Sequence, residues 1–419
     1  FGSFLPSRSL YLLLRYSIPF QPSALVLYVE QQVHTVLLCD NNHLIKSVKN
    51  RSGGLDHIMA QTTTEHDNNC CKDCQSPLGR GLHSLWKANN YPCANNTNGE
   101  KDSEAASSCQ ARLCTTCYGK HPLIRPKSSE NNQNDDPAKG IMKHYCKACF
   151  EETSTIDFSK TYDVIQGNTD NDIVWVFAHG ASGSRQLFRP HAEELNKKFG
   201  HASILWDLPG HSTCLEKPLT LESSQETLES ILKECEAWTK EKKLIYVGGS
   251  LGAYIGFYLL DKLASKFAGA VLMDCGQNVG PGACFKARAG LVMLNYIGKH
   301  WTNATLMQLM LGELKKSKAD YHLMDTCFGS GMFFDQAEAH VTCLKSVAPA
   351  EYIPKYKFPV LFMNGSEDYR DSEHKWLELC AQKEGSELKV YEGGDHFFSH
   401  DSRFVDDILD RMTAYAKKL

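Results

Sequence analysis

The pattern of hydrophobic and polar residues changes near residue 153. Before this point the chain is polar, rich in Asn, Ser and Cys, and has few apolar runs that could build a core. After it, short apolar runs alternate with longer amphipathic segments, as in the strands and helices of a βαβ sheet. We therefore expect a small N-terminal module followed by an α/β domain over residues 153–419.

Six short apolar runs predict buried strands, at residues 173–178, 202–206, 244–247, 268–273, 360–363 and 388–391. Amphipathic segments predict helices, at residues 189–199, 223–240, 251–267, 373–382 and 403–418. Residues 276–350 interrupt the alternation with Gly, Met and aromatic residues. We expect a mostly helical cap here, inserted over the sheet, in which the substrate would be selected.

The charge of the chain is close to balance, with 45 basic and 49 acidic residues and a formal net charge of -4. Such a chain has no strong field that would attract nucleic acid or an anionic membrane. We therefore expect no nucleic-acid partner, and other partners must be inferred from individual sites.

The first methionine is Met59, and we expect residues 1–58 not to belong to the natural protein. Apolar patches at residues 10–14 and 24–29 are interrupted by Arg15 and by prolines, and are too short to cross a bilayer. Residues 1–68 are expected to be a disordered or non-native leader.

One short motif carries the strongest chemical signal. The strand at residues 244–247 runs directly into Gly-Gly-Ser-Leu-Gly at residues 248–252, and a helix follows. This is G-x-S-x-G in the strand-turn-helix context that a nucleophilic serine requires. Ser250 would occupy a strained turn, where a side chain on either flanking glycine would collide with backbone. The helix that begins at Leu251 would direct free N–H groups toward a developing oxyanion.

A loop of small residues, 179–184, follows the strand at residues 173–178. Small residues let the backbone approach a reacting carbonyl. Sites of this kind take one oxyanion donor from such a loop and one from the residue after the nucleophile, so we expect the N–H groups of Ala181 and Leu251 to be the two donors. Asp207, which ends the next strand, is expected to be structural.

A serine hydroxyl needs a base, and the base needs a third group that holds its tautomer. His396 lies between the last expected strand and the last expected helix, and it fits the chain order Ser, acid, His. His400 is the local rival. Asp368 follows the preceding expected strand and is the favoured acid, with Glu367 and Asp274 as alternatives.

Residues 173–419 resemble the α/β-hydrolase superfamily, in its form with a single domain and a helical cap. The resemblance implies a mostly parallel, eight-stranded sheet and a triad formed by Ser250, Asp368 and His396. Because serine rather than aspartate stands at the nucleophile position, the epoxide hydrolase and haloalkane dehalogenase branches are disfavoured. The implied mechanism is acyl transfer to Ser250 followed by hydrolysis, with no organic cofactor.

Ten of the 17 cysteines lie before residue 150, many of them in C-x-x-C pairs. Such pairs in a polar segment favour zinc in a reducing compartment over disulfides. Eight of them would complete two tetrahedral Zn²⁺ sites: Cys71, Cys74, Cys93, Cys109, Cys114, Cys117, Cys146 and Cys149. Metal would have to stabilise a module that lacks a hydrophobic core.

The order and the ending of this cysteine segment, residues 69–152, resemble FYVE-type zinc fingers. The resemblance implies crossed braces, and the ligands of one ion are Cys71, Cys74, Cys114 and Cys117. Those of the other ion are Cys93, Cys109, Cys146 and Cys149, and Cys70 could replace Cys71. The family's basic patch is replaced by residues 89–93, Asn-Asn-Tyr-Pro-Cys, and its Trp-containing motif is missing. The partner of the finger is left open between a membrane phosphoinositide and a protein.

Together these features predict a zinc-finger-tethered serine hydrolase that cleaves a carboxylic ester, thioester or similar acyl bond of a small-molecule substrate. The expected location is the cytoplasm, with peripheral attachment to endosomal membranes if the finger binds lipid. The alternative is a non-catalytic receptor or scaffold that keeps the hydrolase fold as a ligand pocket. Intact Ser250, His396 and Asp368 favour the enzyme, because a binding protein does not need all three.

Overall fold

The computed structural model describes two sets of residues in the 419-residue chain. The first set is 146–153, 156–276, 280, 292, 316–319, 337–368 and 382–419. The second set is six short strands nearer the N-terminus, 37–40, 43–46, 91–92, 112–113, 122–125 and 141–144. Most of the expected cap and of the expected helix at residues 373–382 lies outside these residues, as do the expected zinc ligands from Cys71 to Cys117.

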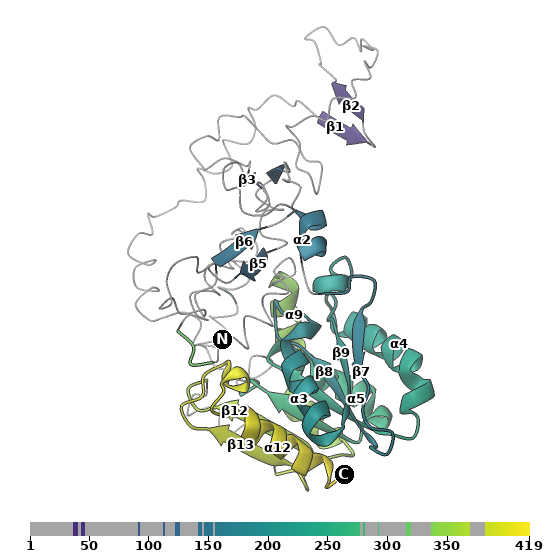
Figure 1. Cartoon of the computed structure of the whole chain (residues 1–419), viewed down its shortest axis with the longest axis vertical. Helices are drawn as coiled ribbons and strands as arrows, with labels where there is room; N and C mark the ends of the chain where they lie inside the picture. The colour runs from purple at the N-terminus through teal and green to yellow at the C-terminus, as the bar shows by residue number, and fades with distance from the viewer. Residues whose placement is uncertain are drawn as a thin grey trace.

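A seven-stranded sheet organises the C-terminal part of the chain, in the order β13-β12-β11-β10-β8-β9-β7 (Figure 1). Its strands are β7 (Tyr162–Ile165), β8 (Ile173–Ala178), β9 (Ala202–Trp206), β10 (Lys243–Gly249), β11 (Gly269–Met273), β12 (Val360–Gly365) and β13 (Glu387–Tyr391). Neighbouring strands are parallel, except that the edge strand β7 pairs antiparallel with β9. The expected α/β fold is confirmed, with seven strands rather than eight in the part of the chain that the structure describes.

The strands predicted from apolar runs are buried in the sheet, except the edge strand β13, in which Tyr391 alone is buried and the other four residues are half-buried. Every residue of β8, β9 and β11 is buried, as is typical of parallel strands covered by helices on both faces. The edge strand β7 was not predicted, because its four residues are only half-buried and include the charged Asp163.

Helices cover both faces of the sheet (Figure 1). They are α3 (Arg189–Phe199), α4 (Leu221–Thr239), α5 (Leu251–Lys262), α9 (Ala337–Ser346), α10 (Pro349–Tyr352) and α12 (Val405–Ala416). Single 3-10 turns are η4 (Arg185–Phe188), η5 (Ser212–Cys214), η6 (Ala264–Lys266), η7 (Ile353–Lys355) and η8 (Phe398–His400). Helices α4, α5 and α9 share one hydrophobic core with the sheet, and α3 and α12 share the other.

The helix bounds differ from the expected ones where capping decides them. Helix α4 begins two residues earlier than expected, because Thr220 and Ser223 exchange hydrogen bonds between side chain and backbone in a capping box. Helix α5 ends at Lys262, and a separate 3-10 turn occupies the residues that the apolar pattern assigned to the same helix.

The N-terminal strands form three antiparallel pairs. They are β1 (Leu37–Asp40) with β2 (His43–Lys46), β3 (Tyr91–Pro92) with β4 (Arg112–Leu113), and β5 (Pro122–Arg125) with β6 (Ile141–His144). The first pair lies within the expected leader and the other two within the expected finger. The short helix α2 (Lys147–Thr153) follows the last of these strands.

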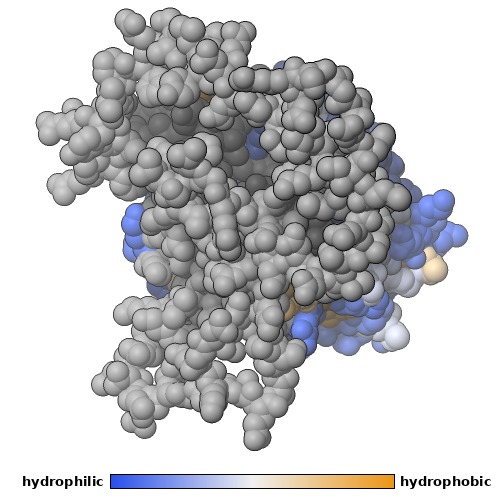
Figure 2. All heavy atoms as spheres, turned by 90° about the horizontal axis from the view of Figure 1, so that it is seen from above, coloured by the Kyte–Doolittle hydropathy of each residue, from blue (hydrophilic) through white to orange (hydrophobic). Residues whose placement is uncertain are grey.

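In the described ranges, no helix is both long enough and apolar enough to span a membrane. The part of the described surface that Figure 2 shows is mainly hydrophilic. Val292 is the large hydrophobic side chain that the described surface exposes.

Candidate active site

Ser250 stands at the sharp turn between β10 and α5. Its backbone has a φ of 51°, in a region that residues other than glycine rarely adopt. A Cβ on Gly248 would lie 2.7 Å from the nitrogen of Ala253, and one on Gly252 would lie 2.4 Å from the oxygen of Ala178. The turn therefore admits only glycine at these two positions, for the steric reason expected from the sequence.

His396 connects Ser250 to Asp368. Its Nε2 atom lies 3.1 Å from Ser250 Oγ, and its Nδ1 atom lies 2.9 Å from Asp368 Oδ2. Because a carboxylate can only accept, it holds the ring proton on Nδ1 and leaves Nε2 free to accept the proton of the hydroxyl. The three side chains, which follow β10, β13 and β12, form one hydrogen-bonded chain at the carboxyl edge of the sheet.

The rival histidine and one rival acid are engaged elsewhere. His400 is buried, and its Nε2–H donates to the carbonyl oxygen of Leu187, 3.0 Å away, while Nδ1 accepts from the hydroxyl of Ser399. Glu367 forms a half-exposed ion pair of 2.5 Å with Lys318. In the described ranges, both side chains are thus committed to partners other than Ser250.

Asp274, the other rival acid, lies at the site. One carboxylate oxygen each of Asp274 and Asp368 and one ring nitrogen of His396 lie within 4.8 Å of one another, close enough to hold a metal ion. Both nitrogens of His396 are already hydrogen-bonded to side chains, so a cation would have to displace Ser250 or Asp368. The group is better arranged for proton transfer than for metal binding.

The loop of residues 179–184 lies against the turn that carries the serine. A Cβ on Gly180 would be 3.4 Å from the Cβ of Ser250. The carbonyl oxygen of Gly180 accepts from Gly183 N–H, at 3.2 Å, and from the Nδ1–H of His179, at 2.8 Å. The peptide between residues 180 and 181 is thus fixed in orientation.

The N–H group of Ala181 belongs to this fixed peptide. In a trans peptide the N–H points opposite to the carbonyl, so it points away from the two groups that bind the Gly180 oxygen. Neither this N–H nor that of Leu251, at the start of α5, donates to another residue of the described part. Within the described residues both N–H groups thus lack an acceptor, as the predicted role of oxyanion donor requires.

Two buried histidines fix the loop of residues 179–184 through hydrogen bonds to backbone groups. The Nε2 atom of His179 accepts from Leu208 N–H at 3.0 Å, and that of His211 accepts from Ser182 N–H at 3.2 Å. The Nδ1–H of His211 donates to the carbonyl oxygen of Pro209 at 2.9 Å. Both rings must be neutral to make these bonds, and burial lowers the pKa of His179 to about 4 and that of His211 to about 3.

A third ring extends this group into α9. The ring centroids of His179 and His211 are 4.9 Å apart, and those of His211 and His340 are 4.8 Å apart in a stacked arrangement. We call these three residues the histidine column. Burial, and then the neighbouring His211, lowers the pKa of His340 well below its ordinary value. The column links α9 to the loop that carries Ala181.

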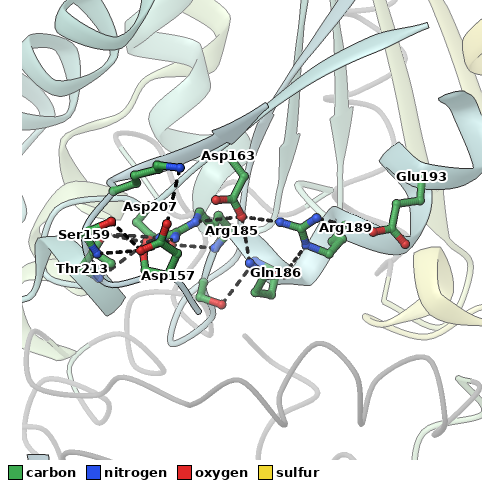
Figure 3. Close-up of polar contacts among 11 residues, drawn as sticks. Asp157, Ser159, Asp163, Arg185, Gln186, Arg189, Glu193, Asp207 and Thr213 are labelled. Atoms are coloured by element: carbon green, nitrogen blue, oxygen red, sulfur yellow. Dashed lines mark hydrogen bonds and ion pairs between the residues drawn. The ribbon is translucent and has the colours of Figure 1, made fainter. Parts of the chain in front are cut away.

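A buried ion pair anchors the end of the loop (Figure 3). The Nη1 atom of Arg185 lies 2.5 Å from Asp207 Oδ2, and the backbone N–H of Arg185 donates to Oδ1 of the same carboxylate at 2.7 Å. The Nε atom of Arg185 lies 3.1 Å from Asp163 on the edge strand β7. Asp207 is thus a structural anchor, whereas Arg185 and Asp163 were not predicted, because their partners are distant in sequence.

Two of the eight expected zinc ligands lie in the described residues. Cys146 and Cys149 are buried at the start of α2, where Phe150 N–H bonds to the carbonyl oxygen of Cys146 at 2.9 Å. In such a helical turn, residues three apart lie on the same side. Both cysteines are buried at this turn, and their role as a pair of Zn²⁺ ligands stays a prediction from the sequence.

Residues 175–410, more than half of the chain, match the profile of the Alpha/beta hydrolase family. The chain matches none of the curated proteins. Among solved structures, it is similar to MenH from S. aureus, with a TM-score of 0.50 and 15% identity over 62% of this chain and 98% of that one. It is also similar to the esterase EaEST from Exiguobacterium antarcticum, with a TM-score of 0.50 and 14% identity over 61% of this chain and 94% of that one. At these identities the two structures establish the fold alone.

Proposed function

This chain belongs to the alpha/beta hydrolase family, and from this premise we propose that it is a serine hydrolase that cleaves an ester, thioester or similar acyl bond of a small molecule. The observation that carries the proposal is the hydrogen-bonded chain from Ser250 through His396 to Asp368. A nucleophile, a base and an orienting acid in this order are the minimum that acyl transfer by serine requires.

In the proposed mechanism, Ser250 Oγ attacks the carbonyl carbon of the substrate while His396 Nε2 takes the hydroxyl proton. Asp368 accepts from Nδ1–H and stabilises the imidazolium that forms. The N–H groups of Leu251 and Ala181 bind the oxyanion, and each such donor contributes about 3 kcal/mol to transition-state stabilisation. His396 then gives its proton to the leaving group, and water, activated by the same base, releases the acid.

The test is hydrolysis of p-nitrophenyl esters of increasing acyl chain length and of a matched thioester series. We expect turnover by the wild type and by Ser230→Ala, whose hydroxyl lies on the exposed face of α4 and binds Glu234. We expect none by Ser250→Ala. Equal turnover by the wild type and Ser250→Ala would refute the proposal. If the folded wild type shows neither turnover nor covalent labelling, the receptor alternative is favoured.

We also propose that residues 69–152 form a zinc finger with two structural Zn²⁺ ions. The support in the described residues is the buried pair of Cys146, directly before α2, and Cys149, in its first turn. The ions would stabilise the module and take no part in the acyl chemistry. Elemental analysis should find two zinc ions per chain, fewer in Cys149→Ser, and two in the control Cys343→Ser, which alters a cysteine of the hydrolase core. A metal-free, folded chain would contradict this.

We also propose that the finger binds either a membrane phosphoinositide or a protein, and that the protein is located in the cytoplasm. Liposome flotation with and without phosphatidylinositol 3-phosphate separates an endosomal lipid from a protein partner. Flotation that depends on the phosphoinositide, and is lost in Cys149→Ser, would favour the membrane. Identical flotation with both liposomes would refute the proposal that the finger binds an endosomal lipid.

A further inference from the structure

A second carboxyl group lies beside His396. Asp274 directly follows β11, whose last residue Met273 pairs with Met363 of β12. The N–H of Asp274 reaches across to the carbonyl oxygen of Met363, at 3.3 Å, and its backbone has a positive φ of 56°. This turn and the one that carries Asp368 therefore leave neighbouring strands at the same edge of the sheet.

The side chain of Asp274 is held within the catalytic group. One of its oxygens lies within 4.8 Å of both an oxygen of Asp368 and a ring nitrogen of His396. Asp274 and Asp368 are 5% and 3% exposed, so their charges interact with little solvent between them. Oδ1 of Asp274 is buried and has no hydrogen-bond partner among the described residues. A surface acid or a fully satisfied structural acid would not be placed in this way.

Two carboxylates this close in a buried site do not both ionise. Burial, and then the charges of Asp368 and Asp395, raise the pKa of Asp274 well above its ordinary value. Asp395 itself accepts from the hydroxyl of Ser317, at 2.7 Å, and from the N–H of Lys318, at 3.0 Å. The charged groups that act on Asp274 are thus Asp368 and Asp395, with the titratable ring of His396 beside them.

We propose that Asp274 is a second positioning acid of the site, whose carboxyl group can orient His396 in place of Asp368. The inference rests on the proposed serine hydrolase. With Asp368 present, the proton stays on Asp274, and the pair presents a single negative charge to the imidazole. With Asp368 removed, one source of repulsion is gone, and Asp274 ionises at a lower pH than before. Its carboxylate then accepts from the imidazole.

The experiment measures kcat/KM for p-nitrophenyl acetate from pH 6 to 9.5 in a set of variants. Asp368→Ala is the main background, because an asparagine amide would donate to Nδ1 and hold the wrong tautomer. In a site with one acid, loss of that acid costs about 10⁴-fold in kcat. We expect Asp368→Ala to retain activity that rises with pH as Asp274 ionises. At pH 9, Asp274→Asn in the same background should lower this activity by at least about tenfold and remove the part of the rise that Asp274 causes, leaving the part that follows from loss of the His396 proton.

The matched control is Glu367→Gln in the Asp368→Ala background. Glu367 is also a carboxylate next to Asp368, but it is ion-paired with Lys318 at the surface. The control should keep the rise with pH. A purely structural role of Asp274 would lower activity equally at every pH, without removing a limb of the profile. If Asp274→Asn does not fold in this background by circular dichroism, the same comparison is made with Asp274→Ala.

Identical pH profiles for Asp368→Ala and the double variant would overturn the inference. Loss of the rise in the Glu367→Gln control would also overturn it, because the titrating group would then be Glu367. Ser250→Ala in the wild-type background keeps the two proposals apart. If Ser250→Ala is active, the serine hydrolase itself is refuted; if it is inactive and the two profiles coincide, only the role of Asp274 is refuted.

Discussion

The region around Ser250 uses histidine in two ways. Both ring nitrogens of His396 bind side chains, the hydroxyl of Ser250 and the carboxylate of Asp368. In the histidine column, both ring nitrogens of His179 and of His211 bind backbone groups. The partners of His396, a hydroxyl and a carboxylate, can gain or lose protons. The peptide groups that bind His179 and His211 cannot.

This difference separates a catalytic ring from a structural one. A ring between a hydroxyl and a carboxylate can carry a proton during a reaction. A ring that accepts from a backbone N–H must stay neutral, and its burial keeps it so. The 17 histidines of the sequence do not differ in type, so their partners distinguish the roles.

The largest expected effect comes from His396 itself. His396→Gln removes the base, and kcat should fall by about 10⁴-fold or more, with the fold intact by circular dichroism. His400→Gln, four residues away, breaks bonds to Leu187 and Ser399 instead, and its cost should be one to three kcal/mol of stability, roughly. Steady-state kinetics and urea unfolding measure both. Equal losses of kcat in the two variants would erase the distinction between the rings.

The next largest effect distinguishes the roles of two buried carboxylates, Asp207 and Asp368. Asp207→Asn removes the fully buried one of the two carboxylates that pair with the buried Arg185 and leaves the partly exposed Asp163, and the free energy of unfolding should fall by about 3 kcal/mol. Asp368→Asn should instead lower kcat and leave most of the stability. Urea unfolding followed by tryptophan fluorescence measures the first, and ester hydrolysis measures the second. A rate loss without a stability loss in Asp207→Asn would contradict its structural role.

The column should affect the rate through the loop that it holds. His211→Leu deprives Ser182 N–H of its acceptor, and the loop that carries Ala181 should lose its fixed position. We expect kcat to fall by about 10²-fold, as for the loss of one oxyanion donor, with little change in KM. His211→Gln, which keeps an acceptor, should recover part of the rate. No recovery, or a change in KM alone, would count against a positioning role.

The smallest effect per residue is the dependence of stability on pH. The folded-state pKa values of His179 and His400 are about 4, and those of His191 and His211 about 3, because these rings are buried. An unfolded histidine has a pKa of about 6.5, so below that pH the unfolded chain binds protons that the folded chain does not. Their contribution is intact above pH 6.5 and is lost as the pH falls toward 4, by about 1 kcal/mol per histidine per pH unit.

Urea unfolding at pH 7, 6 and 5 measures this slope. His211→Leu should show a shallower decline than the wild type, because it has one buried ring fewer. A stability that is constant or rises in acid would mean that the buried rings are already charged in the folded chain.

The sequence predicted the parts of the fold that depend on apolar runs and on local turn chemistry. The bounds of β8 and β9 agree with the apolar runs, and Gly248 and Gly252 flank Ser250 because their surroundings leave no room for a side chain. The sequence did not predict the edge strand β7, because a half-buried strand with a charged residue has no apolar run.

The supports of the site were harder to predict, because they join residues that are distant in sequence. Arg185 stands in a stretch of small and polar residues, and nothing local indicates that Asp163 and Asp207 bury it. His179 and His211 each follow a strand directly or within a few residues, which is the only local signal they carry. Asp274 was recognised as a rival to Asp368, but its place beside both Asp368 and His396 required the geometry of two neighbouring strands.

The most direct test of the central claim, that Ser250 is the nucleophile, is reaction of the folded chain with a fluorophosphonate followed by intact-mass and peptide mass spectrometry. We predict one adduct per chain, on the peptide that contains Ser250, with the same adduct in Ser230→Ala and almost none in His396→Gln. An adduct on another residue, or an unlabelled Ser250 in folded and accessible wild-type protein, would contradict the claim.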